Sequence, residues 1–316
     1  MKMWEMEKQR DAYGEALVEL GRERDDIVVL GADLAGSCRL KKFGEEFPER
    51  MFNMGIAEQN MTGVAAGLAL SGKTVFSSTF AVFATGRAYD QVRQSIAYPK
   101  LDVKIVSTHA GITVGGDGAS HQMLEDIALM RVIPNVKVVA PADYHESRKA
   151  TFAIAEEEGP FYMRMGRSSV PVITEKDDPF EVGKATMLRE GGDVTLIGTG
   201  IMVSECLKAA EILNKQHEID AKVLNMSTIK PLDDESIVES ARDTGGIVTA
   251  EEHVVSQGMG SGISQVLAES NYHVPLKRVG IPNVFGESGE SDELMEKYGL
   301  TAEHIVESAH DVLERR

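Results

Sequence analysis

The sequence predicts an α/β protein with two domains, each built on a parallel sheet that helices cover. Short apolar runs alternate with helical segments along the chain, the pattern of parallel strands joined by crossover helices. A polar, proline-punctuated stretch divides these repeats, as linkers do, and 316 residues suffice for two cores. We therefore predict a first domain over residues 1–170, a linker over 171–184 and a second domain over 185–316.

The first domain carries the longer series of elements. Its predicted strands cover residues 27–30, 73–77, 101–107, 136–140 and 161–165. Its predicted helices cover residues 11–20, 58–70, 80–98, 123–130 and 144–156. Residues 50–53 are expected to form a strand end or a turn.

The second domain repeats the alternation on a smaller scale. Its predicted strands cover residues 193–198, 221–224, 246–250 and 276–279. Its predicted helices cover residues 202–214, 234–241 and 302–313, with one more after the Gly-rich run 258–262.

Composition and charge exclude several function classes. Fifty acidic against thirty-three basic residues give a net charge of −17, which repels nucleic acid and anionic membranes, so neither is expected as a partner. No run approaches the ~20 apolar residues that span a bilayer. The two cysteines, Cys38 and Cys206, are far apart in sequence and indicate reduced thiols in a cytoplasmic protein rather than a metal site.

A single carboxylate stands at the start of the predicted helix 58–70. Glu58 lies in the segment Gly55-Ile-Ala-Glu-Gln-Asn60, and the helix after it is rich in small and apolar residues. An acidic residue in the first turn of a helix is stabilised by the helix dipole. These six residues by themselves favour that structural interpretation.

The Gly-rich loop 108–122 is the strongest local signal of a ligand site. It follows the end of a predicted parallel strand, where open α/β sheets place ligands. It contains His109, Asp117 and His121, side chains that donate, accept and transfer protons near neutral pH. A solvated loop with incidental histidines is the alternative, and the combination favours a polar ligand site.

The same loop contains part of a diphosphate and Mg²⁺ signature, Gly116-Asp117-Gly118. The signature needs an Asn well downstream, and Asn135 is too close and heads a strand. There is also no P-loop and no GxGxxG after a strand. We therefore expect no metal ligands in this chain.

Three further groups are ambiguous by themselves. Phe80 and Phe83 are spaced to form a stacking face or part of the core. Arg164 and Arg167 follow a strand, where a guanidinium suits either a phosphate monoester or a surface salt bridge. The segment Glu251-Glu252-His253 follows a predicted strand, which is compatible with function, an interface or a structural role.

Taken in order, these segments resemble the C-terminal half of a transketolase. They are residues 55–60, Ser78-Thr-Phe80-Ala-Val-Phe83, the 108–122 loop and Met165-Gly-Arg167. The resemblance covers the pyrimidine-binding domain and the C-terminal domain, and so almost the whole chain. It implies thiamine diphosphate as the cofactor.

The resemblance assigns the cofactor ring to the first domain. Glu58 would hydrogen-bond N1′ of the aminopyrimidine, and Phe80, Phe83 and Ile56 would line the ring pocket. A third aromatic residue, expected one turn after Phe83, is absent because position 86 is Gly. Tyr89 is the candidate replacement.

The resemblance to a transketolase also implies which residues form the substrate site. Asp117 would read the C2 hydroxyl of the donor sugar, and His121 would contact hydroxyls at the reacting carbons, with the two histidines acting as catalytic proton carriers. The positions that match the sugar-phosphate group are His109, Arg167, Ser37 and Arg10.

The domain that grips the diphosphate and its Mg²⁺ or Ca²⁺ has no counterpart in these residues. The resemblance therefore implies the C-terminal-half subunit of a split transketolase, whose partner subunit is an N-terminal half in an α2β2 assembly, a heterotetramer. The pair would transfer a two-carbon ketol unit from a ketose phosphate to an aldose phosphate in the pentose phosphate pathway. The alternatives are a β subunit of a 2-oxoacid dehydrogenase, a 1-deoxyxylulose-5-phosphate synthase-like enzyme and a non-catalytic regulatory or scaffolding module. The segment Arg87-Ala-Tyr-Asp-Gln-Val92 is somewhat closer to the deoxyxylulose enzyme.

Overall fold

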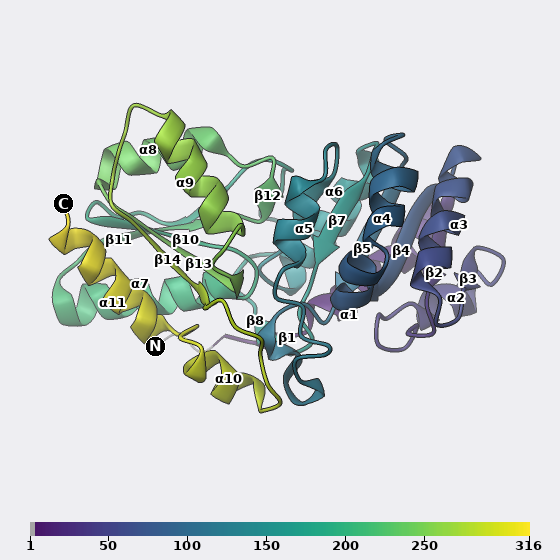
Figure 1. Ribbon diagram of the computed structural model, residues 1–316, viewed down its shortest axis with the longest axis horizontal. Coiled ribbons are helices and arrows are strands. Elements are labelled where there is room, and N and C mark those ends of the chain that lie inside the picture. Colours follow the sequence, from purple (N-terminus) through teal and green to yellow (C-terminus); the bar gives the residue numbers. More distant parts are fainter. Residues whose placement is uncertain (1–3) are drawn as a thin grey trace.

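A computed structural model describes residues 4–316 and shows two α/β domains side by side (Figure 1). The α/β class and the two large sheets, one in each domain, agree with the sequence prediction. The predicted first domain begins at residue 1, and residues 1–3 lie outside the described range.

The first domain is built on a seven-stranded sheet. Every strand pair in it is parallel except β12 with β6, which is antiparallel. In spatial order the strands are β12 (Thr228–Lys230), β6 (Lys137–Val139), β7 (Phe161–Arg164), β5 (Val103–Thr108), β4 (Thr74–Phe80), β2 (Ile27–Gly31) and β3 (Met51–Asn53).

Helices cover both faces of this sheet because its strands are apolar on both sides. One face packs against α1 (Gln9–Glu23), α2 (Lys41–Glu46) and α6 (Tyr144–Glu156). The other face packs against α3 (Glu58–Leu70), the π-helical segments η1 (Val82–Arg87) and η2 (Val92–Ala97) with the short α4 (Tyr89–Gln91) between them, and α5 (Asp126–Val132).

The second domain has a five-stranded sheet with helices on both faces. Its strands, in spatial order, are β14 (Leu276–Ile281), β13 (Ile247–Val254), β10 (Val194–Gly198), β11 (Ala221–Asn225) and the antiparallel edge strand β9 (Thr186–Arg189). The helices are α7 (Met202–His217) and α11 (Ala302–Glu314) on one face, α8 (Asp234–Thr244) and α9 (Met259–Glu269) on the other, and the separate α10 (Ser291–Lys297).

Chain segments from the two predicted domains interlock. Strand β12 lies beyond the predicted linker in sequence but joins the first sheet. Within the first domain, β1 (Met6–Glu7) pairs with β8 (Val170–Pro171) at the start of the predicted linker. One hydrophobic cluster also runs through both domains, from Val75 in β4 to Ile263 in α9. The linker at 171–184 therefore remains a prediction from the sequence.

Three of the predicted boundaries that differ from the structure lie close to the candidate site. Strand β4 continues to Phe80, which pairs with Thr108 of β5. The helical region therefore starts with η1 at Val82, and the short helix α4 follows after Ala88. Helix α5 begins at Asp126 rather than 123. Strand β13 includes the segment Glu251-Glu252-His253 instead of ending before it. Pairing with neighbouring strands extends β4 and β13 beyond the local pattern. Met123 forms a bridge with Ala110 instead of joining α5.

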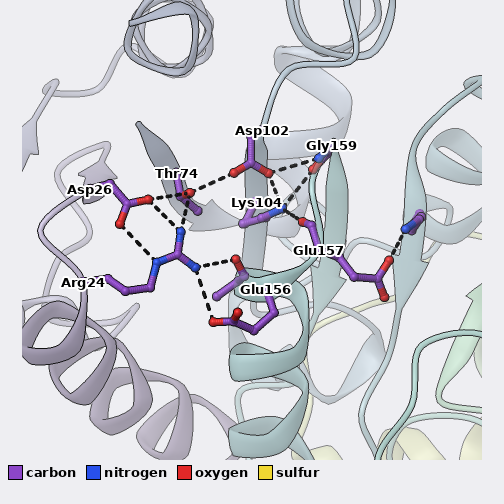
Figure 2. Close-up of polar contacts among 10 residues, drawn as sticks. Arg24, Asp26, Thr74, Asp102, Lys104, Glu156, Glu157 and Gly159 are labelled. Carbon is purple, nitrogen blue, oxygen red and sulfur yellow. Dashed lines mark hydrogen bonds and ion pairs between the residues drawn. The ribbon is translucent and has the colours of Figure 1, made fainter. Parts of the chain in front are cut away.

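A network of polar side chains lies at the amino-terminal edge of the first sheet (Figure 2). Arg24 donates two hydrogen bonds to Asp26, at 3.1 and 2.7 Å, and the Thr74 hydroxyl donates to Asp102 at 2.9 Å. The fully buried Lys104 donates to the Gly159 carbonyl at 3.0 Å and contacts Asp102, and burial lowers its pKa. These groups satisfy one another, so the strand ends at this edge are tied together.

Candidate active site

The opposite, carboxyl-terminal edge of the first sheet gathers the predicted site residues. Phe80 ends β4, and Thr108 ends β5 just before His109. Ser37 follows β2, and Arg167 follows β7. Because the carboxyl ends of parallel strands meet at one edge, residues far apart in the sequence converge there.

Glu58 is the first residue of α3 and is only 2% exposed. Its Oε2 accepts a hydrogen bond from Nη1 of Arg87 at 2.9 Å. The side chain of Arg87 is 47% exposed, so a buried carboxylate is paired with a half-exposed guanidinium. Ile56 lies just before α3 and is 78% exposed.

A continuous row of rings connects the two histidines. His109 stacks on Phe80 with ring centroids 3.7 Å apart, and Phe80 stacks on Phe83 at 6.0 Å. Phe83 then meets His121 edge-on at 5.6 Å. The two phenylalanines therefore form one aromatic wall with an imidazole at each end.

Arg87, rather than Tyr89, stands beside this wall. The guanidinium carbon of Arg87 lies 4.5 Å from the centroid of Phe83, a cation–π arrangement. Tyr89 packs against the hydrophobic core that α3 shares with the sheet. In this structure the place next to Phe83 is thus taken by a cation.

His109 is held as a neutral imidazole. Burial is the largest cause that lowers its pKa, to about 3, and the positive charges of Arg10, Arg167 and Arg39 lower it further. Its Nδ1 lies 2.8 Å from the hydroxyl of Thr108. At neutral pH this histidine can therefore donate and accept hydrogen bonds without carrying charge.

Arginines surround the far end of the row from Glu58. Arg10 donates to the Ser37 carbonyl at 3.0 Å, and its buried Nε has no hydrogen-bond partner among residues 4–316. Arg167 donates to the Val114 carbonyl at 2.7 Å and lies 3.8 Å from Asp117. The guanidinium groups of Arg10 and Arg167 thus lie at the same end of the row, and at least Nε of Arg10 is available to a ligand. Two such groups suit a phosphate-like anion.

Arg164 does not belong to this group. It is 5% exposed, and its Nε donates to Asp126 Oδ2 at 2.7 Å, while the Tyr162 hydroxyl donates to the same oxygen at 2.6 Å. Its Nη2 also donates to the Glu252 carbonyl of the second domain at 3.2 Å. Neither alternative proposed from the sequence applies, because Arg164 forms a buried ion pair with Asp126.

The described part of the chain shows neither a metal cluster nor a membrane-spanning helix. Residues 4–316 contain no group of three or more His, Cys, Asp or Glu side chains placed to hold a metal ion. None of the described helices has the length and apolar character required to cross a membrane.

Family models match both parts of the chain. The transketolase pyrimidine-binding domain matches residues 6–172, and the transketolase C-terminal domain matches residues 183–305. The chain belongs to the transketolase family. The resemblance of the short segments therefore extends to the complete domains that contain them.

Individual transketolase relatives have the same extent as this chain. A Methanocaldococcus jannaschii protein assigned as a transketolase C-terminal section is 51% identical over 299 residues, which are 94% of this chain and 93% of that protein. A 6-deoxy-6-sulfo-D-fructose transketolase subunit of Clostridium sp. is 47% identical, over 97% of this chain and 95% of the relative. The solved β4 tetramer of a split-gene transketolase, described as inactive, superimposes with a TM-score of 0.91 at 52% identity and covers 98% of this chain and 99% of that one. The chain is thus a transketolase-type transferase subunit that acts with a partner subunit.

The transketolase family implies thiamine diphosphate dependence. The residues present fit the pyrimidine end of that cofactor, because a buried carboxylate, Glu58, lies near a stacked aromatic pair. A carboxylate can hydrogen-bond a ring nitrogen, and aromatic faces pack on a flat heterocycle.

Two residues at the candidate site were not singled out from the sequence. Arg87 appears there only as part of a motif, although a basic residue one helical turn after Phe83 is a usable signal. Arg39 carries no signal, because its effect on His109 depends on how β5 and the loop after β2 approach each other. Thr108, whose hydroxyl lies beside Nδ1 of His109, is the first residue of the predicted loop 108–122.

Proposed function

We propose that this chain and an N-terminal-half subunit together form a thiamine diphosphate site that moves a two-carbon ketol unit from a ketose phosphate to an aldose phosphate. The observation that carries the proposal is the buried Glu58 near the row of rings that leads to His109. One end of this row suits a heterocycle and the other, lined by arginines, suits an anion. The two ends match a cofactor ring and a sugar phosphate.

Each residue then has a distinct task. Glu58 would hydrogen-bond N1′ of the aminopyrimidine, while Phe80 and Phe83 hold the ring; Ile56, being exposed, would contact it only from the rim. Bound thiamine diphosphate would supply the nucleophilic carbon that adds to the donor carbonyl. The protein's part is to orient the ring and to hold the proton at N1′.

The substrate would lie along the loop after β5. His121 and Asp117 would contact sugar hydroxyls, and Arg10, Arg167, Ser37 and His109 would hold the phosphate. Since His109 is neutral, we propose that it donates a hydrogen bond there, and that His121 is the better candidate for proton transfer. An anchor far from the reacting carbons positions the substrate, which contributes to the rate.

We propose that the partner subunit grips the diphosphate through Mg²⁺ or Ca²⁺ and that the assembly is α2β2. The solved relative in which β chains associate by themselves is described as inactive, which supports the need for a second kind of chain. The pentose phosphate pathway is the proposed metabolic setting, and the cytoplasm the proposed location, which the two buried, unbridged cysteines support.

Reconstitution with the partner subunit tests the proposal. Ketol transfer should appear only with both chains, without release of CO₂, and donors should include phosphorylated and sulfonated ketoses, since one relative is named for a sulfo-sugar. Release of CO₂ from a 2-oxoacid donor would instead support the decarboxylating alternatives, of which a 1-deoxy-D-xylulose-5-phosphate synthase is a relative at 39% identity. Calorimetry with thiamine diphosphate and Mg²⁺ provides an independent result, because tight binding by this chain without its partner would contradict a divided site.

A further inference from the structure

The second domain reaches into the candidate active site through Glu252. This residue lies on β13 and is buried. Its Oε1 accepts a hydrogen bond from the backbone N–H of Thr113 at 2.7 Å. Thr113 belongs to η3 (Ile112–Asp117), the 3₁₀ turn in the middle of the loop that carries His109, Asp117 and His121. A carboxylate of one domain thus holds a main-chain group of the other.

The fit between this carboxylate and the loop is tight. Gly111 adopts a φ of +84°, and a Cβ at this position would overlap the carboxyl group of Glu252. The glycine is therefore required for two reasons, its left-handed backbone and the close approach of the side chain. The loop and the second domain are therefore closely packed at this point.

A second element of the same domain holds the carbonyl of Thr113, which belongs to the next peptide group. The Ser291 hydroxyl, at the start of α10, donates to the Thr113 carbonyl at 3.0 Å. Gln122, at the far end of the loop, donates to the Glu287 carbonyl at 2.8 Å. The loop is thus fixed to the second domain at its centre and at its end.

The centre of the loop in turn supports an arginine of the proposed phosphate site. The carbonyl of Val114, the residue after Thr113, accepts the 2.7 Å hydrogen bond from Arg167. A shift of η3 would therefore move the partner that orients Arg167, together with Asp117 at the end of the same turn. His109 lies only two residues before Gly111.

The adjacent carboxylate shows that this arrangement is specific to one residue. Successive side chains of a strand point to opposite faces, and Glu251 faces its own domain. There it accepts hydrogen bonds from the N–H groups of Met259 at 2.7 Å and Gly260 at 2.9 Å, at the start of α9. Two neighbouring buried glutamates therefore have separate tasks, and only one of them touches the loop.

We propose that Glu252 is a positioning residue, by which the second domain fixes the loop 108–122 and hence Arg167, Asp117 and His109. The catalytic consequence rests on the proposed function. The structural part, a hydrogen-bonded clamp on Thr113, can be tested without any substrate.

Hydrogen exchange of the full chain tests the clamp directly. In Glu252→Ala we expect amide exchange in residues 111–118 to be at least about tenfold faster, since a buried hydrogen bond that protects the loop is lost. Exchange at the start of α9 should stay unchanged. Glu252→Gln keeps an acceptor oxygen and should restore most of the protection. Unchanged loop exchange in a folded Glu252→Ala protein would overturn the proposal.

Matched variants separate the clamp from general damage. Glu251→Ala should accelerate exchange at residues 259–260 and leave the loop alone. If Glu252→Ala does not fold, Glu252→Asp keeps the charge but shortens the side chain by one carbon, and it should accelerate exchange in residues 111–118 because the carboxylate no longer reaches the N–H of Thr113. Unchanged loop exchange in a folded Glu252→Asp protein would contradict the clamp.

Kinetics of the reconstituted pair test the positioning role. Glu252→Ala should raise KM for a phosphorylated donor about tenfold or more, since Arg167 loses its support, while Glu252→Gln should stay within about threefold of wild type. If amide exchange in residues 111–118 is faster in Glu252→Ala but KM and kcat are unchanged, the positioning role is overturned. If the wild-type pair shows no ketol transfer at all, the proposed function fails, whereas the exchange result still decides on the clamp.

Discussion

Nη1 of Arg87 donates to Oε2 of Glu58 across 2.9 Å, and the same guanidinium lies over the ring of Phe83. The carboxylate proposed to bind the cofactor ring therefore already has a cationic partner in this chain. The segment that carries Arg87 is π-helical, a local form that often occurs at functional sites. Because the side chain of Arg87 is half exposed, we expect that it can swing away from Glu58 into solvent without a change in the fold around Glu58.

Replacing Glu58 tests the central role. Glu58→Gln keeps the side-chain shape and an acceptor for Arg87, so the chain should still fold and the free energy of unfolding should change by no more than about 2 kcal/mol. Turnover of the reconstituted pair should fall at least about 100-fold, because the amide cannot hold the ring nitrogen in the required protonation state. Urea unfolding and single-turnover kinetics measure the two effects. Glu45→Gln on the exposed side of α2 is the control, and wild-type turnover in Glu58→Gln would contradict the role.

Replacing Arg87 tests whether its pairing competes with the cofactor. In Arg87→Ala the ring would no longer have to displace a guanidinium from Glu58, so thiamine diphosphate should bind the pair about three- to tenfold more tightly. Calorimetry on the reconstituted pair measures the change. Weaker binding would instead mean that Arg87 stays beside the ring in the bound state.

The depressed pKa of His109 predicts a pH dependence of stability. The unfolded chain binds a proton here near the ordinary value of 6.5, whereas the folded chain does so only at about 3. Between these values the unfolded state binds more protons, so the free energy of unfolding decreases as the pH falls. The loss from this group is about 2 kcal/mol between pH 8 and pH 5.

Two measurements check this expectation. The imidazole signals of His109 in NMR spectra should stay those of the neutral form down to about pH 4. The difference in unfolding free energy between wild type and His109→Gln should diminish in acid, since other groups cancel in the comparison. A His109 that titrates near pH 6.5 would contradict the structure.

Arg167→Ala tests the phosphate assignment. KM for phosphorylated donors should rise about tenfold or more, because a charged hydrogen bond to the phosphate is lost. Unphosphorylated ketoses should be affected little, and Arg93→Ala on η2, an exposed arginine away from the site, should affect neither. Equal losses for both kinds of donor would show that Arg167 does not read the phosphate.

The buried ion pair of Arg164 with Asp126 predicts a large effect on stability. Asp126→Ala leaves the charge of Arg164 buried without its carboxylate and removes the acceptor of the Tyr162 hydroxyl. We expect a loss of about 3–5 kcal/mol in the free energy of unfolding. Urea denaturation measures it, with the exposed Asp90→Ala as a control that should change it by less than about 0.5 kcal/mol.

The sequence by itself determined the α/β class, the alternating order of strands and helices, and the edge where the site residues gather. These properties follow from periodicity and from glycines at strand ends, and both are local. The motif set also determined the family, because Glu58, Phe80, Phe83 and the 108–122 loop occur together in a fixed order.

Only the tertiary structure decided which partners these residues meet. The pairing of Glu58 with Arg87, the burial of Arg164 against Asp126, and the reach of Glu252 to Thr113 join residues that are 29, 38 and 139 positions apart. The same holds for β12, which crosses to the first sheet. Such contacts depend on how whole elements pack and on which buried polar groups must be satisfied, and no local pattern contains that information.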